Sequence, residues 1–414
     1  MHSLHPHTFE RSQPPLEGEH DSAAVLSNQV FDLQIKERLD SRLNETVAEF
    51  ERKNRMSVSR RGDTYEYVLR ANGTEQTLFT TAASDQGLKD AQKRLDTLVA
   101  EKATEMEQRY RVSIARQDEY IGKMKVMAAQ SSGIMDVFAR APKLAELQGL
   151  EAALSKSEPS RNDLRIYFVR DMYPQGFGVF AYYDNDPSGR PAIFLQPGVD
   201  DRPPTERDRP PLAVLSGNLD AGTSIEALVT HEIAHRHQLR MGWDKDSVVN
   251  DVAEKMGWKP YIAGKGDTRY LLMSKAVDSS GNARLYSNRG SWILSDERGQ
   301  PIDMAGNPVE PLDTVTPSND EMLAQALIKP ATPYFRDPIE MYAEALMLLR
   351  LGDDSRKALL SRNRGLYDLV KSKDQEEIDA ELGTGKLIRS ISGELIPDNQ
   401  ANRTSIRSWE TTDR

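Results

Sequence analysis

The sequence predicts an α+β fold with two domains, and three observations lead to this prediction. Apolar residues recur at spacings of three and four over much of residues 29–157, which is typical of amphipathic helices. Residues 164–197 contain three runs rich in β-branched and aromatic residues, as expected of strands. Helical spacing returns at 224–241 and again at 338–351. We therefore expect a mainly helical accessory domain with one β-hairpin, followed by a mixed domain at residues 160–375.

The composition limits the class of partner. The chain has 414 residues, of which 38% are hydrophobic and 29% charged, and its formal net charge is −10. Phosphate binding requires a concentrated positive face, so this charge balance gives no reason to expect a nucleic-acid partner. No apolar stretch approaches the length of a membrane span. The chain has no cysteine, which excludes disulfides and thiolate metal sites.

The first part of the chain is expected to be a leader and a helical domain. Residues 1–28 are polar, include three prolines and lack the apolar core of a secretory signal peptide, so we expect a disordered leader. Asn72 and Gly73 stand between two alternating runs and predict a hairpin. Helical spacing predicts helices at 29–55, 84–130, 134–141 and 143–156. Such an accessory domain is suited to binding a partner or a delivery factor.

Pro159 and Ser160 mark the expected boundary of the second domain, and strands follow it. The last two are joined by a turn at 186–189. The strand at 192–197 has two possible positions. As an edge strand it would pair with an extended peptide, and as an internal strand it would have neighbours on both sides.

The later elements are predicted from turn chemistry and helical spacing. Residues 265–316 contain short alternating runs separated by turn sequences, which predicts a β-rich insertion. Residues 376–414 are expected to form a polar tail, with a hairpin around Gly393 and a disordered end. Further helices are expected at 246–255, 318–328 and 353–371.

The helix predicted at 224–241 has signals at both ends. Thr223 stands three residues before Glu226 in a capping-box pattern, and Gly242 is typical of a helix C-terminus. The segment VTHEIAHRHQL therefore lies within one helix.

Three residues of that segment, His231, Glu232 and His235, form a candidate metal site. Residues four apart project from one face of a helix, so both imidazoles can bind one ion while Glu232 points beside them at a water. Zinc suits imidazole ligands, and a water on zinc loses a proton near neutral pH, so Glu232 is the candidate general base. His237 lies about 200° round the helix from His235, and we expect it to be a supporting or a surface residue.

A zinc ion held for catalysis needs a third protein ligand. No histidine follows His237, so a carboxylate is expected. Glu340 and Glu344 share one face of the otherwise apolar helix at 338–351, and buried acids need a positive partner such as a metal ion. The alternatives are two surface histidines on an ordinary helix and a solvated pair of acids on a half-exposed one.

The sequence HEIAH, followed downstream by EMYAEA, resembles the gluzincin metallopeptidases, in particular the lethal-factor-like zinc peptidases of secreted bacterial toxins. The resemblance covers two short helices. It implies a zincin-like domain with one Zn²⁺ per chain, held by His231, His235 and Glu340, with Glu344 as a supporting residue. It also implies an oxyanion-stabilising tyrosine before the ligand glutamate. Tyr334 matches that position, although it lies six residues before Glu340 where seven are expected.

The function implied by this resemblance is zinc-dependent hydrolysis of a protein or peptide substrate by an exported toxin or effector. No Sec-type signal is visible, so the protein is expected either in the cytoplasm or exported by a specialised secretion system. Two alternatives remain open. The first is a non-catalytic binding or scaffolding protein with a zincin fold, and the second is a zinc hydrolase acting on a non-protein amide such as cell-wall peptide.

Overall fold

The protein mixes helices and sheets, as the sequence predicts. We describe it from a computed structural model. The model describes residues 38, 41–71, 74–128, 131–158, 160–170, 180–196, 224–243, 258–262, 268–277, 283–287, 292–295, 301–302 and 338–412. The chain divides into two compact units, one formed by Met1–Arg70 and Thr74–Arg94 and the other by Ala71–Gly73 and Leu95–Arg414. Among the described residues, no helix has the length and apolar character needed to cross a membrane.

The first unit is built on a three-stranded antiparallel sheet in the order β1-β2-β3. The predicted hairpin appears as β2 and β3, although its turn residues lie outside the described residues. The ring of Tyr67 is buried between Phe50 and Phe79, with ring centroids 5.3 and 4.9 Å away. The elements are a helix at 41–54, β1 (Ser57–Arg61), β2 (Thr64–Ala71), β3 (Thr74–Ala82) and the start of α2 (Asp85–Tyr110).

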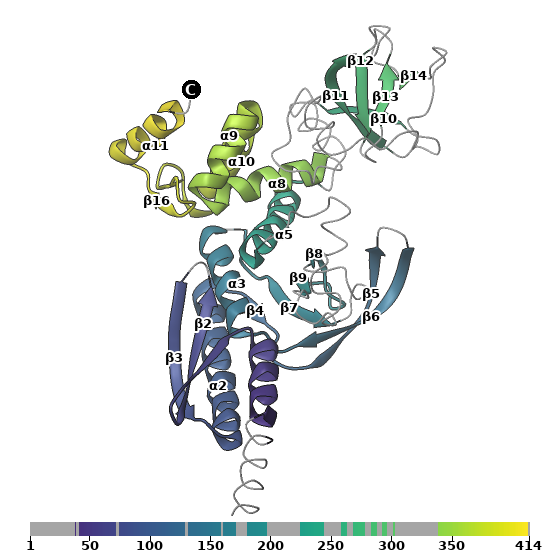
Figure 1. The fold of residues 1–414 in the computed structure, drawn as a ribbon. Coiled ribbons are helices and arrows are strands. Elements are labelled where there is room, and N and C mark those ends of the chain that lie inside the picture. The colour runs from purple at the N-terminus through teal and green to yellow at the C-terminus, as the bar shows by residue number, and fades with distance from the viewer. Residues whose placement is uncertain are drawn as a thin grey trace, which may run out of the picture. The chain divides into compact units, whose positions relative to one another are not determined.

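The second unit contains a six-stranded sheet in the order β5-β6-β7-β9-β8, with β4 beside β7 (Figure 1). Strand β9 is parallel to β7 and antiparallel to β8. It is therefore an internal strand, so the second of the two positions considered for 192–197 is the one found, and the edge position is not. Among the described strands, β8 ends the sheet on that side. The strands are β4 (Ser113–Ile114), β5 (Glu119–Ala128), β6 (Ser131–Arg140), β7 (Arg165–Arg170), β8 (Phe180–Asn185) and β9 (Pro191–Gln196).

One face of this sheet is covered by helices. Ile166 of β7 and Ile193 of β9 belong to a buried cluster with Leu150 of α3 (Leu144–Lys156) and Ile233 of α5 (Ile225–Arg240). Alternate residues of the same strands point to the other face, as the period of two along a strand requires. The sheet thereby provides the apolar base on which α5 rests.

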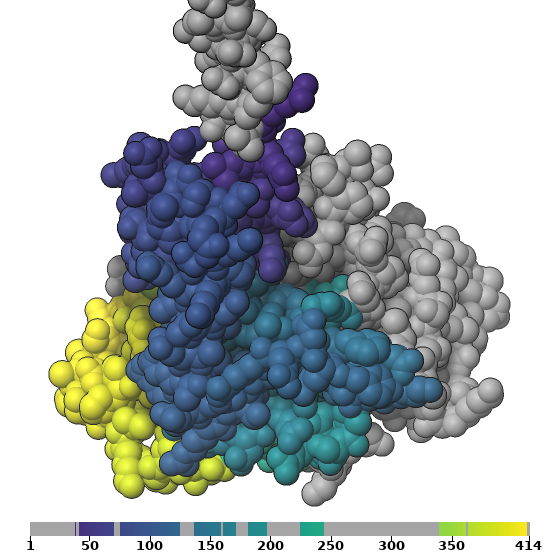
Figure 2. Space-filling model, turned by 90° about the horizontal axis from the view of Figure 1, so that it is seen from below, coloured from purple at the N-terminus to yellow at the C-terminus, as the bar shows by residue number. Residues whose placement is uncertain are grey.

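The stretch between α2 and α3 differs from the prediction. The helix expected at 84–130 ends at Tyr110, and residues 134–140 of the helix expected at 134–141 belong to β6. Strands β5 and β6 form a long hairpin, which among the described residues pairs with β7 through 138–140 and extends beyond it as an arm (Figures 1 and 2). Within β6, Val137 and Ala139 are buried while Phe138 is exposed, so the real period of this segment is two.

This hairpin changes the domain description. The stretch predicted as a mainly helical accessory domain, residues 29–157, also contains β1 to β6. Because β4 and β6 pair with β7, one sheet joins residues on both sides of the boundary expected at Pro159 and Ser160.

The C-terminal part of the second unit is helical and ordered. One buried cluster joins Ala234 of α5 to Leu346 of α8, Leu359 of α9 and Val370 of α10. The helix expected at 353–371 is two helices, because Asn363 interrupts it and caps the second by accepting from the Leu366 N–H. These elements are α8 (Pro338–Leu351), α9 (Asp353–Arg362), α10 (Arg364–Leu382), β15 (Leu387–Arg389), β16 (Leu395–Pro397) and α11 (Gln400–Thr412).

The expectation of a disordered end at residues 399–414 is therefore wrong for the described part, because α11 reaches residue 412. The predicted hairpin around Gly393 is present as β15 and β16. A further antiparallel sheet has the order β10-β11-β12-β13-β14, and β11 to β14 lie within the stretch predicted as β-rich, 265–316. Its strands are β10 (Trp258–Ile262), β11 (Thr268–Val277), β12 (Ala283–Ser287), β13 (Trp292–Ser295) and β14 (Pro301–Ile302). The leader and the helices predicted at 246–255 and 318–328 lie outside the described residues.

Candidate metal centre

Helix α5 carries three of the predicted site residues, and its ends are well defined. Ser224 caps its N-terminus, with its hydroxyl oxygen 3.1 Å from the Ala227 nitrogen, in place of the predicted Thr223. With Ser224 as the N-cap, the third helical residue is Ala227, which has no carboxylate for a capping box, and the Glu226 carboxylate bonds to Lys156 at 2.9 Å. Gly242 follows the helix with a φ of 81°, a conformation that glycine adopts without strain.

Helix α8 packs against α5 and carries the two predicted acids. It begins at Pro338, where a missing N–H is harmless, as predicted. Its apolar residues, including Met341 and Leu346, are buried with Ala234 of α5. Glu340 and Glu344 lie on the face toward α5, where both reach His231.

Three side chains from these helices converge as a group, which we call the metal group: His231, His235 and Glu340. His231 Nε2 lies 3.1 Å from both His235 Nε2 and Glu340 Oε2, and the remaining edge, His235 Nε2 to Glu340 Oε2, is 3.5 Å. Tetrahedral ligands bound to zinc at about 2.0–2.1 Å are about 3.3 Å from one another. The three donor atoms therefore fit one face of such a site. Within the described part of the chain, no other three acidic or histidine side chains converge in this way.

Both histidines are oriented through their second nitrogen. Glu344 Oε1 lies 2.8 Å from His231 Nδ1, and Gln238 Oε1 lies 2.9 Å from His235 Nδ1. The amide of Gln238 also donates to the backbone oxygen of Ile339 on α8, at 2.7 Å. Acceptor oxygens beside Nδ1 favour the tautomer that carries its proton there, with each Nε2 facing the metal group, which is the usual arrangement around metal-bound histidines. Sequence reasoning missed Gln238 in this role, although its position three residues after His235 places it on the same side of the helix.

The electrostatics of the metal group favour positive charge at its centre. Burial alone would lower the pKa of His231, but its hydrogen bonds to Glu340 and Glu344 raise that pKa well above the ordinary value. Burial would also lower the pKa of His235, but the negative charge of Glu340 raises it, and the net effect is a raised pKa. Burial would raise the pKa of Glu340, but the two imidazoles hold it far below its usual range. A cation bound among the three donors would take the place of these protons.

Glu232 lies beside the metal group and has a different environment. Its side chain is buried, and burial raises the pKa of its carboxyl despite the nearby imidazoles. The backbone of Tyr183 in β8 lies near enough to the carboxylate to favour its charged form, which partly offsets the effect of burial on the pKa. Strand β8 therefore borders the predicted general base.

His237, which was predicted to be a supporting or a surface residue, does not join the metal group. His237 is fully buried rather than at the surface, and it bonds to Glu377 and Tyr342 instead of to the metal group. Tyr334 lies outside the described residues.

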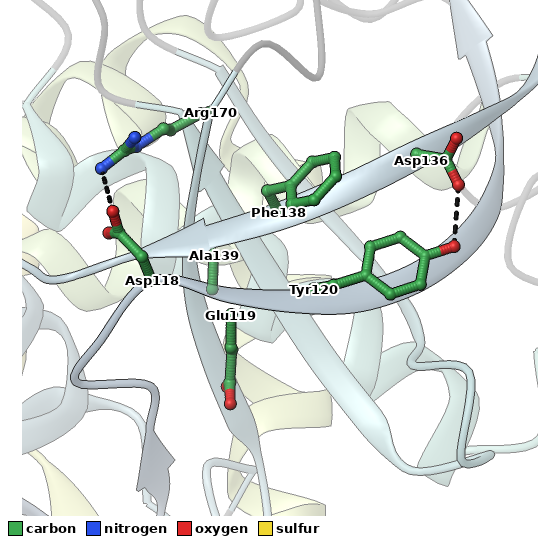
Figure 3. Close-up of a pocket in the computed structure, with 7 residues that line it drawn as sticks. All are labelled: Asp118, Glu119, Tyr120, Asp136, Phe138, Ala139 and Arg170. Carbon is green, nitrogen blue, oxygen red and sulfur yellow. Dashed lines mark hydrogen bonds and ion pairs between the residues drawn. The ribbon is translucent and has the colours of Figure 1, made fainter.

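A hollow of about 520 Å³ lies elsewhere, on the β5–β6 hairpin and β7 (Figure 3). It is bordered by the exposed rings of Tyr120 and Phe138, whose centroids are 5.2 Å apart, and by an ion pair between Asp118 and Arg170. None of the predicted site residues lines it. The chemistry of the described residues is therefore concentrated at α5 and α8.

Comparison of the chain with protein-family models, with curated proteins and with solved structures found no match. The geometry of the metal group is consequently the observation on which a functional conclusion rests.

Proposed function

We propose that the protein is a zinc-dependent metallopeptidase whose residues 160–375 form a zincin-like catalytic domain. The observation that carries the proposal is the convergence of His231, His235 and Glu340 with Glu232 beside them. Two imidazoles and one carboxylate are a common ligand set of catalytic zinc, with one position left open for water or substrate. When bound there, zinc polarises the scissile carbonyl and lowers the pKa of water.

Glu232 is the general base of the proposed reaction. Its buried carboxylate takes a proton from the attacking water and then passes it to the leaving amine. A raised pKa suits both steps, because it brings the carboxyl nearer to the pH at which it must accept and release the proton. The partly exposed side chains of His235 and Glu340 leave the site open to substrate.

The edge of β8 supports a peptide as the substrate. Strand β8 is the last described strand on its side of the sheet, packs against α5 and passes beside Glu232 at Tyr183. The last strand of a sheet has a row of backbone groups that no other described strand pairs with. An extended peptide that pairs with this edge would lie next to Glu232. Strand β8 thus takes the peptide-pairing role that was considered for residues 192–197.

The test compares wild type with Glu232→Gln and Glu226→Gln. Each chain is incubated with a peptide library that is read by mass spectrometry, and its zinc content is measured after dialysis. We expect about one zinc per chain in all three. Cleavage should be lost only in Glu232→Gln, because Glu226 bonds to Lys156 and does not contact the metal group.

Normal cleavage by Glu232→Gln would refute the mechanism. A wild type that holds zinc but cuts no peptide would instead favour a scaffolding role or a hydrolase for a non-protein amide.

A further inference from the structure

Helices α5 and α8 are joined by a second polar contact beside the metal group. His237 Nε2 lies 3.0 Å from the Tyr342 hydroxyl, and the two rings stack with an angle of 9° between their planes. His237 follows His235 by two residues, and Tyr342 follows Glu340 by two residues. The same pair of helices is therefore joined at two points, one inside the metal group and one outside it.

Glu377 of α10 anchors this second contact. Its Oε2 accepts from His237 Nδ1 at 2.8 Å, from the Ser160 hydroxyl at 2.5 Å and from Arg350 at 3.3 Å. Its other oxygen lies 3.5 Å from an Arg240 nitrogen. One buried carboxylate on α10 thus holds side chains of α5, of α8 and of the segment that follows α3.

The cluster is buried and its charges are balanced. Arg350 also bonds to Asp374 at 2.8 Å, and Asp374 pairs with Arg389 of β15 at 2.5 Å. Apart from Arg240, these side chains are nearly inaccessible to solvent. Buried ion pairs of this kind hold their partners in one geometry, because movement leaves a charge without compensation.

The metal group depends on the relative position of α5 and α8, since α5 supplies two donors and α8 supplies one. We propose that Glu377 is a positioning residue for the metal group, acting through Arg350 and through the contact of His237 with Tyr342 to fix α5 against α8. The expected effect of Glu377 on metal affinity does not depend on the proposed peptidase function. An effect of Glu377 on peptide cleavage would depend on it.

The test measures Co²⁺ binding, because the visible absorption of Co²⁺ reports its coordination geometry. Wild type, Glu377→Ala, Glu377→Gln and Glu410→Ala are titrated in competition with a chelator, at a temperature where circular dichroism shows each to be folded. Glu410 is the matched control, since it is also a buried carboxylate of the C-terminal segment but bonds to Lys371 and Tyr367.

We expect Glu377→Ala to bind Co²⁺ about 10–100-fold more weakly, with an altered spectrum, as for other residues that orient metal ligands. Glu377→Gln keeps an oxygen that accepts from His237 and should recover most of the lost affinity. Glu410→Ala should keep the wild-type affinity and spectrum. If Glu377→Ala does not fold, Tyr342→Phe carries the test, because it deletes one hydroxyl and should also weaken Co²⁺ binding.

Wild-type Co²⁺ affinity in folded Glu377→Ala, or in Tyr342→Phe where that variant is needed, would overturn the proposal. An equal loss of affinity in Glu410→Ala would also overturn it, because general loosening of the fold would then explain the effect. If the variants show the expected differences in Co²⁺ binding but the wild type cleaves no peptide, the peptidase function is refuted and the positioning role is still supported.

Discussion

Removing Glu344 should weaken zinc binding even though Glu344 is not one of the three converging donors. Its Oε1 lies 2.8 Å from His231 Nδ1, and His231 Nε2 faces Glu340. Without this acceptor, His231 can turn its ring or move its proton to Nε2, and either change removes a donor from the metal group. Loss of such a partner costs about 10–100-fold in metal affinity, or about 1.4–2.7 kcal/mol. We therefore expect Glu344→Ala to bind zinc about 10–100-fold more weakly than wild type.

The assay is competition for zinc against a chromophoric chelator at fixed pH. Glu226→Ala is the control, because Glu226 is also a partly buried acid on a metal-bearing helix but pairs with Lys156. Glu344→Gln should lose less affinity than Glu344→Ala, since its amide oxygen can still accept from His231. Equal zinc affinity in Glu344→Ala and wild type would refute the reasoning, and so would an equal loss in Glu226→Ala.

Two further predictions concern stability. The pKa of the Glu377 carboxyl is lowered from 4.5 to about 2 by its hydrogen bond with His237, which outweighs its burial. Ionised Glu377 should therefore contribute about 3 kcal/mol to the free energy of unfolding. This contribution is fully present above pH 4.5 and is lost as the pH falls through about 2. The urea midpoint should therefore fall less steeply below pH 4.5 in Glu377→Gln than in wild type. Arg140 forms two hydrogen bonds, at 2.7 and 2.9 Å, with the fully buried Glu146, and Arg140→Ala should cost about 3–5 kcal/mol in urea unfolding. Parallel acid profiles would contradict the first prediction, and a loss below about 1 kcal/mol would contradict the second.

The two helices of the metal group could be predicted from the sequence because their signals are local. Glycine after α5 and proline at the start of α8 act within one or two residues of the helix end, and the spacing of His231 and His235 places both on one face. Convergence with Glu340 needed the additional argument that buried acids require a positive partner, and the structure places these side chains together.

The errors arose where the decisive contacts are between distant residues. The β5–β6 segment contains apolar residues at spacings compatible with a helix, and pairing between strands determines its real conformation. The internal position of β9 depends on strand order, which no local pattern contains. Glu377 is 140 residues from its partner His237, so only the folded chain reveals the contact.

The charges around the polar face of α5 also support the proposal of a cation at this site. Glu232, Glu340 and Glu344 surround two imidazoles in a largely buried region, and removing three carboxylates from water is costly unless positive charge meets them. The imidazoles can compensate by holding protons, which is why their pKa values are raised. When the imidazoles hold protons, their Nε2 atoms form hydrogen bonds within the metal group, although both rings are already held at Nδ1. A divalent cation compensates the same carboxylates with two charges at one point, at the position where all three donors already converge.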